Sequence, residues 1–147
     1  MMLKAQITED MKSAMRAKES TRLGTIRLLQ AAMKQREVDE RIELADADVI
    51  GIIEKMLKQR RDSIAAYESA KRDDLADIEK AEVVVLQAYL PKQLTEAEVA
   101  VLLEKVIADT GAASMKDMGK VMAAIKPLVA GKADMGKISG LIKARLA

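Results

Sequence analysis

The sequence contains no cysteine, histidine, phenylalanine or tryptophan, and its only aromatic residues are two tyrosines. Without cysteine, the chain has no disulfide, no zinc–thiolate site and no thiolate nucleophile, and without histidine it lacks the commonest general base and metal ligand. Only two prolines and seven glycines occur, and 50% of the residues are hydrophobic, which argues against a disordered chain. The scarcity of aromatic residues also argues against a β-sandwich.

Good helix formers (alanine, leucine, methionine, lysine and glutamate) make up most of the chain instead. Apolar residues recur at intervals of three and four positions, which predicts an all-α protein. We expect a bundle of about four helices in residues 1–90, followed by a small three-helix group in residues 95–147. The helices are expected to begin at about Leu3, Leu23, Leu44, Asp73, Glu96, Met115 and Met135.

A domain boundary is predicted where the fourth helix meets Pro91. Proline lacks an N–H and biases the preceding residue away from helical geometry, so the helix should end there. Thr95 then begins a capping box and a hydrophobic staple that extends to Val99. Residues 1–90 are therefore expected to form an N-terminal helical domain and residues 95–147 a C-terminal three-helix domain.

Other local signals mark helix ends. Ser20 and Thr21 should form a break and a new cap, and the polar run Lys58–Asp62 should interrupt the third helix and be exposed. A segment resembling a weakened capping box begins at Ala45. In the last third of the chain, Gly111 can take a left-handed cap conformation, Gly131 should end a turn, and the last two helices should be capped by Ser114 and Asp134.

Charge is unevenly distributed along the chain. Residues 1–90 hold 16 basic and 17 acidic side chains, whereas residues 116–147 hold 7 basic and 2 acidic ones. Such a tail is either an ordinary solvated surface or a surface that faces a polyanion. No apolar run of about 18 residues is present, and the first residues lack the apolar core of a signal peptide. We therefore expect a cytoplasmic protein with no membrane partner.

Few residues suggest catalysis. No glycine-rich phosphate loop occurs, and the acidic groups at residues 37–40 and 73–77 are explained as solvated helix faces or helix starts. We expect no catalytic residue, no metal and no cofactor. The ten methionines are typical of a pliable core, or alternatively of a groove for a partner.

One pattern occurs twice. Asp117–Val121 and Asp134–Ile138 both read Asp-Met-Gly-Lys followed by a branched aliphatic residue, 17 positions apart, and each lies at an expected helix start. Glycine inside a helix costs about 1 kcal/mol relative to alanine, so a compensating gain is expected. The gain could come from tight packing between the two helix starts, or from a phosphate bound by free N–H groups, the helix dipole and lysine. The match could also be chance.

Several segments closely resemble the YqeY family of small bacterial proteins: Leu86–Thr95, Asp117–Met122 and Gly131–Asp134, together with Ile26–Leu29 and Lys58–Ile64. The resemblance covers essentially the whole chain. The second half of such proteins is similar to the C-terminal tail of the B subunit of the glutamyl-tRNA(Gln)/aspartyl-tRNA(Asn) amidotransferase. That tail is a helical module implicated in holding the tRNA body.

The resemblance implies a non-catalytic module that binds structured RNA, with tRNA as the expected partner, in association with tRNA-dependent amidation or aminoacylation. A second expected partner is an aminoacyl-tRNA synthetase or a tRNA-dependent amidotransferase, and the oligomeric state is left open. At the turn where the amidotransferase tail has an Asn-Pro-like step, this chain has Asp134-Met135. The residues implied in RNA binding are Gly119, Lys120, Gly131, Lys132 and Lys137, and Asp134 belongs to the same motif.

Two alternatives remain. The protein could be an adaptor whose N-terminal helices dock on an aminoacyl-tRNA enzyme without contacting RNA. It could also be an accessory component with carbon–nitrogen ligase activity that uses glutamine as amido donor, although such sites need glycine-rich loops to hold an oxyanion. If the protein binds RNA, the lack of aromatic residues favours contacts to phosphates and 2′-hydroxyls over base stacking.

Overall fold

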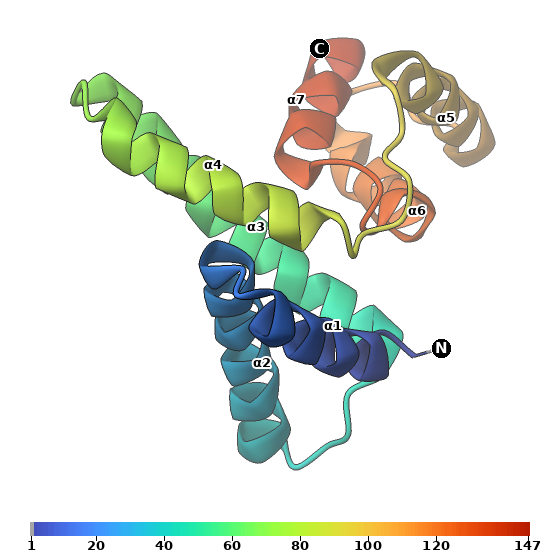
Figure 1. The fold of residues 1–147 in the computed structure, drawn as a ribbon. Helices are drawn as coiled ribbons and strands as arrows, with labels where there is room; N and C mark the ends of the chain where they lie inside the picture. Colours follow the sequence, from blue (N-terminus) through green and yellow to red (C-terminus); the bar gives the residue numbers. More distant parts are fainter. Residues whose placement is uncertain (1) are drawn as a thin grey trace. The chain divides into compact units, whose positions relative to one another are not determined.

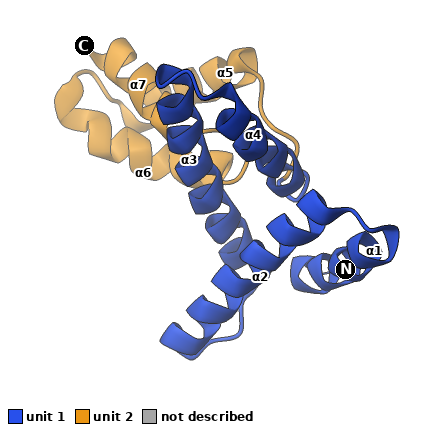
Figure 2. Ribbon diagram, turned by 60° about the vertical axis from the view of Figure 1, so that its left-hand side comes forward, with its two compact units in different colours: residues 1–90 blue, residues 91–147 orange. Residues whose placement is uncertain are grey.

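The computed structural model describes residues 2–147, and every regular element in that range is helical (Figure 1). The predicted all-α class is therefore confirmed. The chain divides into two compact units (Figure 2), residues 1–90 and residues 91–147. Their independent folding stays a prediction. The described helices are α1 (Leu3–Ala17), α2 (Ser20–Glu40), α3 (Asp46–Ser69), α4 (Asp73–Gln87), α5 (Glu96–Thr110), α6 (Met118–Val129) and α7 (Met135–Leu146), with a 3₁₀ turn at Met115–Asp117.

In the first unit, α3 and α4 lie along each other, and α1 and α2 pack with them around one hydrophobic core (Figure 1). The core takes fully buried side chains from all four helices: Ile7, Ile26, Leu29, Ile53 and Leu86. Burying a side chain of this size contributes about 2 kcal/mol. Burial of the apolar side chains at these regularly spaced positions therefore contributes most of the stability of this unit.

The start of α1 is fixed by contacts with distant residues. Among residues 2–90, no N-cap side chain of α1 to α4 accepts a hydrogen bond from its helix. Instead, the N–H of Leu3 donates to Asp46 Oδ1 at 2.9 Å, and Lys4 Nζ donates to Glu37 Oε2 at 2.7 Å. This second bond is the main reason why the pKa of Glu37 is lowered and the pKa of Lys4 is raised.

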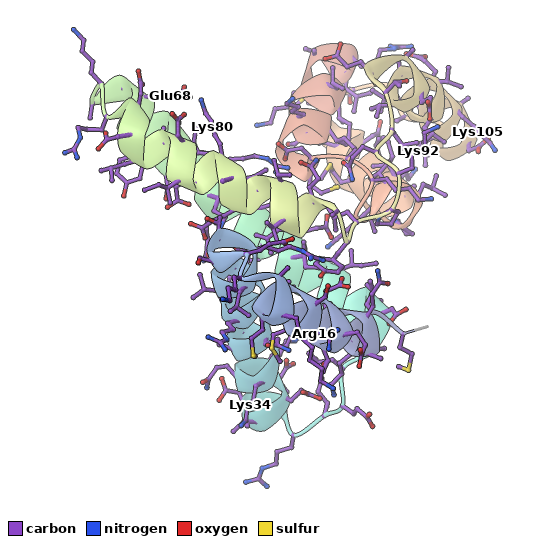
Figure 3. All side chains as sticks on the ribbon, in the orientation of Figure 1. Arg16, Lys34, Glu68, Lys80, Lys92 and Lys105 are labelled. Carbon is purple, nitrogen blue, oxygen red and sulfur yellow. The ribbon has the colours of Figure 1, made fainter. Side chains whose placement is uncertain are left out.

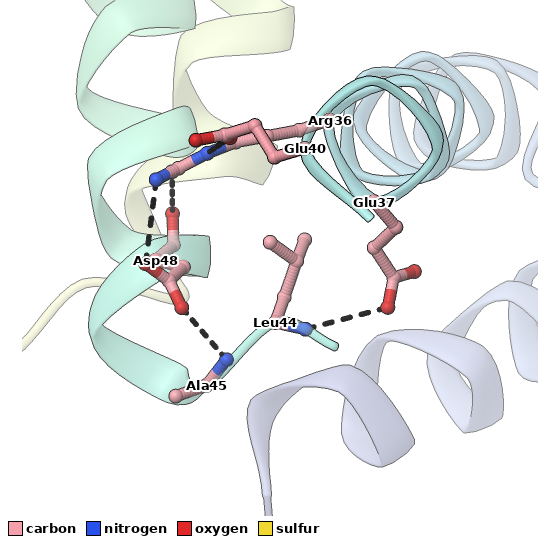
Figure 4. Close-up of polar contacts among 6 residues, drawn as sticks. All are labelled: Arg36, Glu37, Glu40, Leu44, Ala45 and Asp48. Carbon is pink, nitrogen blue, oxygen red and sulfur yellow. Dashed lines mark hydrogen bonds and ion pairs between the residues drawn. The ribbon is translucent and has the colours of Figure 1, made fainter. Parts of the chain in front are cut away.

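The loop between α2 and α3 is held in a similar way (Figure 4). Glu37 Oε2 also accepts the N–H of Leu44 at 3.3 Å, and Asp48 Oδ2 accepts the N–H of Ala45 at 2.9 Å. The other oxygen of Asp48 lies 3.4 Å from Arg36 Nη2. The weakened capping box predicted at Ala45 is therefore confirmed, because Asp48 forms the reciprocal bond although alanine offers no side-chain acceptor.

Two local predictions for this unit are wrong. Ser20 is the first residue of α2 rather than a break, because α1 already ends in the left-handed residue Lys18 (φ 58°). The polar run Lys58–Asp62 does not interrupt α3, although its residues are exposed as predicted except for Arg60. Within it, the Arg60 side chain is only 12% exposed, because its Nη2 donates to Glu82 Oε2 of α4 at 2.9 Å.

In the second unit, α5, α6 and α7 surround a separate hydrophobic core. The side chains of Val121, Ile125 and Val129 on α6 and of Ile142 on α7 are fully buried, and α5 adds Leu103. These positions follow the apolar spacing of the sequence. The predicted order of an N-terminal bundle and a small C-terminal helical group is confirmed.

Local signals fix the helix ends of the second unit. Thr95 Oγ1 accepts an N–H of the first turn of α5 at 3.1 Å, and Gly111 ends that helix with φ 67°. Asp134 Oδ1 accepts an N–H of the first turn of α7 at 2.9 Å. These three predicted caps are confirmed. The predicted helix start at Ser114 is found at the 3₁₀ turn, which runs directly into α6: Ser114 is the N-cap of the turn, and Asp117 Oδ2 accepts the N–H of Ser114 at 3.4 Å.

Candidate nucleic-acid interface

The turn between α6 and α7 is defined by its glycine. Gly131 is buried and takes φ 72°, a left-handed conformation that costs glycine little because it has no Cβ. The N–H groups of Lys132 and Ala133 then donate to the carbonyl oxygen of Val129 at 2.8 and 3.2 Å. The prediction that Gly131 ends a turn is confirmed.

The segment that leads into α5 is hydrogen-bonded to the same turn. Gln93 Nε2 donates to the carbonyl oxygen of Gly131 at 2.7 Å. The N–H of Leu94 donates to the carbonyl oxygen of Lys132 at 2.8 Å. Since Lys92 directly precedes Gln93, these two bonds keep Lys92 close to the turn (Figure 3).

Four exposed lysines lie on the segments that join at this turn, and we refer to them as the turn lysines: Lys92, Lys126, Lys132 and Lys137. None of the ion pairs found within residues 2–147 uses their ammonium groups. Arg145 differs from them, because its guanidinium donates to Glu104 at 2.5 and 3.1 Å. That contact lowers the pKa of Glu104. The turn lysines therefore present charge that the second unit does not neutralise.

Few acidic groups oppose the turn lysines. Asp134 is the one acidic residue of positions 118–147, and it already accepts the N–H of Gly136. Glu96 and Glu98 stand in the first turn of α5, just beyond the linker. The start of α7 adds the positive end of a helix dipole. An anion bound at the turn would thus face mainly positive charge, with the acidic side chains of Glu96 and Glu98 at the start of α5.

Lys120 lies at the other end of α6. Nine residues separate it from Val129, which corresponds to about 13 Å along the helix axis. Its Nζ donates to the carbonyl oxygen of Thr110 at the end of α5, at 3.2 Å. Tight packing between the two helix starts, one of the explanations considered for the repeated pattern, is therefore not found, because α6 separates its own start from the turn. RNA contact by Lys120 stays a prediction.

The glycines of the two copies also differ from expectation. A Cβ added at Gly119 would meet nothing within 4 Å, so the predicted close approach of another backbone is wrong there. At Gly136 a Cβ would lie 3.3 Å from Asp134 Oδ1, the oxygen that caps the helix. Neither glycine contacts the other helix start, and whether Gly119 and Gly131 contact RNA stays a prediction.

The shared pattern has a structural explanation in the rest of its residues. The last residues of the two copies, Val121 and Ile138, are buried in the same core. The first residues, Asp117 and Asp134, both accept backbone N–H groups at a helix start. Hydrogen bonds from the backbone N–H groups of Ala113 and then of Ser114 lower the pKa of Asp117. Each copy thus combines an aspartate that accepts backbone N–H groups, before α6 for Asp117 and in the first turn of α7 for Asp134, with a branched side chain that is buried four residues later.

Sequence reasoning missed two of the turn lysines, Lys92 and Lys126. No helical periodicity or motif relates Lys92 to residues forty positions away. Its placement depends on the tertiary hydrogen bond between Gln93 and Gly131. Lys126 could have been found, because it lies in the last turn of a predicted helix immediately before the turn.

Two structural features are absent from the described residues. Within residues 2–147, no three side chains of histidine, cysteine, aspartate or glutamate gather where they could hold a metal ion. In the same range, no helix has the length and apolarity needed to cross a bilayer.

The family pattern of the YqeY-like proteins matches residues 4–146. The chain belongs to the YqeY-like family. Curated relatives of this YqeY-like protein include the "altered inheritance of mitochondria protein 41, mitochondrial" of three fungi. The Eremothecium gossypii protein is 39% identical over 87 residues, covering 58% of this chain and 48% of the relative. The Vanderwaltozyma polyspora protein is 32% identical over 119 residues, 76% of this chain and 64% of the relative.

The third relative, from Pyrenophora tritici-repentis, is 32% identical over 126 residues, which cover 82% of this chain and 70% of the relative. The chain thus spans between 48% and 70% of the length of these relatives. Their names assign those fungal proteins to mitochondria. The cytoplasmic location expected for this YqeY-like chain stays a prediction.

Proposed function

We propose that residues 91–147 of this YqeY-like protein form a non-catalytic module that binds structured RNA, with tRNA as the ligand, through the turn lysines. The observation that carries the proposal is the gathering of these four exposed lysines around one glycine-defined turn. The positive tail of the sequence, with 7 basic and 2 acidic residues in positions 116–147, supports it.

The type of contact follows from the residues that are present. Lysine ammonium groups bind phosphates as point charges, and each one neutralises about one phosphate. The two tyrosines of the chain, Tyr67 and Tyr89, both belong to the first unit, so the second unit offers no aromatic ring for base stacking. Recognition would therefore depend on the shape and backbone of a folded RNA rather than on its base sequence.

The backbone that carries the lysines is well suited to this task. Gln93 and Leu94 are hydrogen-bonded to the turn, and Gly131 fixes its conformation. Binding then requires ordering of the lysine side chains but little ordering of the backbone, which lowers the entropic cost of association. The resemblance to the amidotransferase B-subunit tail supports tRNA as the RNA, and association with tRNA-dependent amidation or aminoacylation as its setting.

The test is a filter-binding titration of the full chain with total tRNA at several salt concentrations. We compare the parent with the triple variant Lys92→Ala, Lys132→Ala and Lys137→Ala. Each lost phosphate contact should reduce the slope of log affinity against log salt by about 0.7–0.9. The circular dichroism spectrum should be unchanged, because these side chains are exposed.

The matched control removes three exposed lysines from the first unit, with Lys12→Ala, Lys55→Ala and Lys58→Ala. It changes the net charge by the same amount and should leave the slope unchanged. Lys12 pairs with Glu9, but both side chains are exposed and such a pair contributes little, whereas Lys4 is unsuitable because it is hydrogen-bonded to the partly buried Glu37 at 2.7 Å. If the turn variant and the parent bind tRNA with the same affinity and slope, the proposal is wrong.

A further inference from the structure

The helix α2 carries a second apolar stripe on the side that faces away from the core. Ile26, Leu29 and Met33 supply its buried face. Leu28 and Val38 are 53% and 63% exposed, and the exposed Ala31 lies between them. Ala31 follows Leu28 by three residues and Val38 follows Ala31 by seven, as a and d positions of a heptad do, and the polar Gln35 occupies the a position between them.

A row of basic residues runs beside this stripe. Arg27 and Lys34 are exposed and seven residues apart, which is about 10 Å along α2, and the exposed Arg41 follows as the C-cap of the helix (Figure 3 labels Lys34). The ion pairs found in residues 2–147 do not include these three cations. Arg36 on the same helix contrasts with them, because it is paired with Glu40 and Asp48.

Together, the stripe and the row have the arrangement of one strand of a heteromeric coiled coil, in which apolar a and d positions are flanked by charges that select the partner. We propose that the outer face of α2 is a docking surface for an amphipathic helix of another protein, with apolar a and d positions and acidic flanking positions. This surface is separate from the turn lysines, so the proposal does not depend on RNA binding.

Charge complementarity decides between the candidate occupants. A second copy of α2 would bring its own basic row to the interface, and its exposed carboxylates beside Val38, those of Asp39 and Glu40, are already bonded to Gln35 and Arg36. RNA would neutralise the cations but would leave Leu28 and Val38 against a phosphate surface, with no gain from their burial. An acidic amphipathic helix covers the apolar stripe and neutralises the row at the same time.

The probe is a synthetic helix of about three heptads with leucine at a and d and glutamate at e and g. It carries one tryptophan, and because the chain has none, its fluorescence anisotropy reports binding directly to the full-length protein. A second peptide of the same design has lysine at e and g. We expect one-to-one binding of the acidic peptide, weakened by salt, and binding of the basic peptide that is at least about tenfold weaker.

Charge reversal tests the row itself. The double variant Arg27→Glu and Lys34→Glu should lower the affinity for the acidic peptide by about tenfold and raise the affinity for the basic peptide. The matched control, Lys55→Glu and Lys58→Glu on the exposed side of α3, should bind both peptides as the parent does. Leu28→Asp should abolish binding while leaving the helical spectrum unchanged, since Leu28 lies outside the core.

Three results would overturn the proposal. One is equal binding, or no binding, of the two peptides. Another is a reduced salt slope for tRNA in the α2 charge-reversal variant, which would assign the row to RNA. The last is a dimer of the full chain in sedimentation velocity that Leu28→Asp dissociates, since the face would then be covered by a second copy.

Discussion

The two units end and begin their helices by different means. In the first unit, the residues that take left-handed backbone conformations at helix ends are Lys18, Arg41 and Lys71, with φ of 58, 53 and 58°. In the second unit, Gly111 and Gly131 take this role, with φ of 67 and 72°. A left-handed residue with a Cβ costs about 1–2 kcal/mol more than glycine.

The starts of the helices show the same difference. Thr95 and Asp134 cap helices of the second unit through their own side chains. In the described part of the first unit, α1 begins with a bond to Asp46, forty-three residues away. Long-range polar contacts occur in both units, but only the second unit adds side-chain N-caps and glycines at its helix ends, while the described helices of the first unit begin without a side-chain cap.

The strongest test of this comparison separates the units. Because Tyr89 and Gln93 are anchored within their own units, we expect trypsin to cut first after Lys92. Residues 1–92 and 93–147 should then appear as fragments in mass spectrometry. A first cut within residues 99–108, inside α5, would contradict the two-unit division.

The largest effect of a single substitution is expected in the first unit. Glu82→Ala leaves the Arg60 guanidinium largely buried without its carboxylate partner, and Arg60 Nε already has no hydrogen-bond partner among the described residues. We expect the free energy of unfolding to fall by about 3 kcal/mol, measured by urea denaturation. Glu68→Ala, which removes an exposed partner of Lys80, is the control and should cost much less.

Tyr89→Phe should have the next largest effect. The Tyr89 hydroxyl donates to Asp10 Oδ2 at 2.6 Å, and loss of a hydrogen bond to a charged group should cost about 1.5 kcal/mol at neutral pH. Burial, and then this bond to Asp10, raise the pKa of Tyr89.

The raised pKa of Tyr89 gives the pH dependence a definite sign. Below the pKa of an unfolded tyrosine, at about pH 10, the contribution of Tyr89 to stability is fully present, and it is lost as the pH rises further. The difference in stability between the parent and Tyr89→Phe should therefore shrink above about pH 10. A difference that stays constant in denaturation curves across this range would contradict the assignment.

The difference in N-caps between the units can be tested by removing a cap from the second unit and adding one to the first. Thr95→Ala should lower the free energy of unfolding by about 1 kcal/mol, because the cap bond to Glu98 is lost. Ala45→Ser should raise it by up to about 1 kcal/mol, because Ala45 is an exposed N-cap in extended conformation without a side-chain acceptor. If both changes are neutral in thermal unfolding, the contrast between the units is incorrect.

The smallest effects distinguish the two Asp-Met-Gly-Lys copies. Gly119→Ala should stabilise the protein by about 1 kcal/mol, since the added methyl group meets open space. Gly136→Ala should change stability little, because its methyl group crowds the capping oxygen of Asp134 and offsets the helix propensity. Equal stabilisation by both changes would show that this contact has no effect.

Much of the fold could be predicted because its signals are short-range. The all-α class follows from composition and apolar spacing, and the ends of α5 and α7 follow from caps that involve residues within four positions. The start of α2 could not be predicted. It follows from the left-handed backbone of Lys18, and lysine is not a residue that prefers this conformation. The burial of Arg60 depends on Glu82 of another helix.

The candidate interface divides in the same way. The sequence by itself determined that the last 32 residues are basic, that the chain is helical, and that Lys132 and Lys137 flank a glycine turn. Only the tertiary structure brought Lys92 to that turn and placed Lys120 at the opposite end of α6. The physical reason is range: caps and helix periodicity involve neighbours in the chain, whereas the clustering of charges depends on which distant backbone groups share hydrogen bonds.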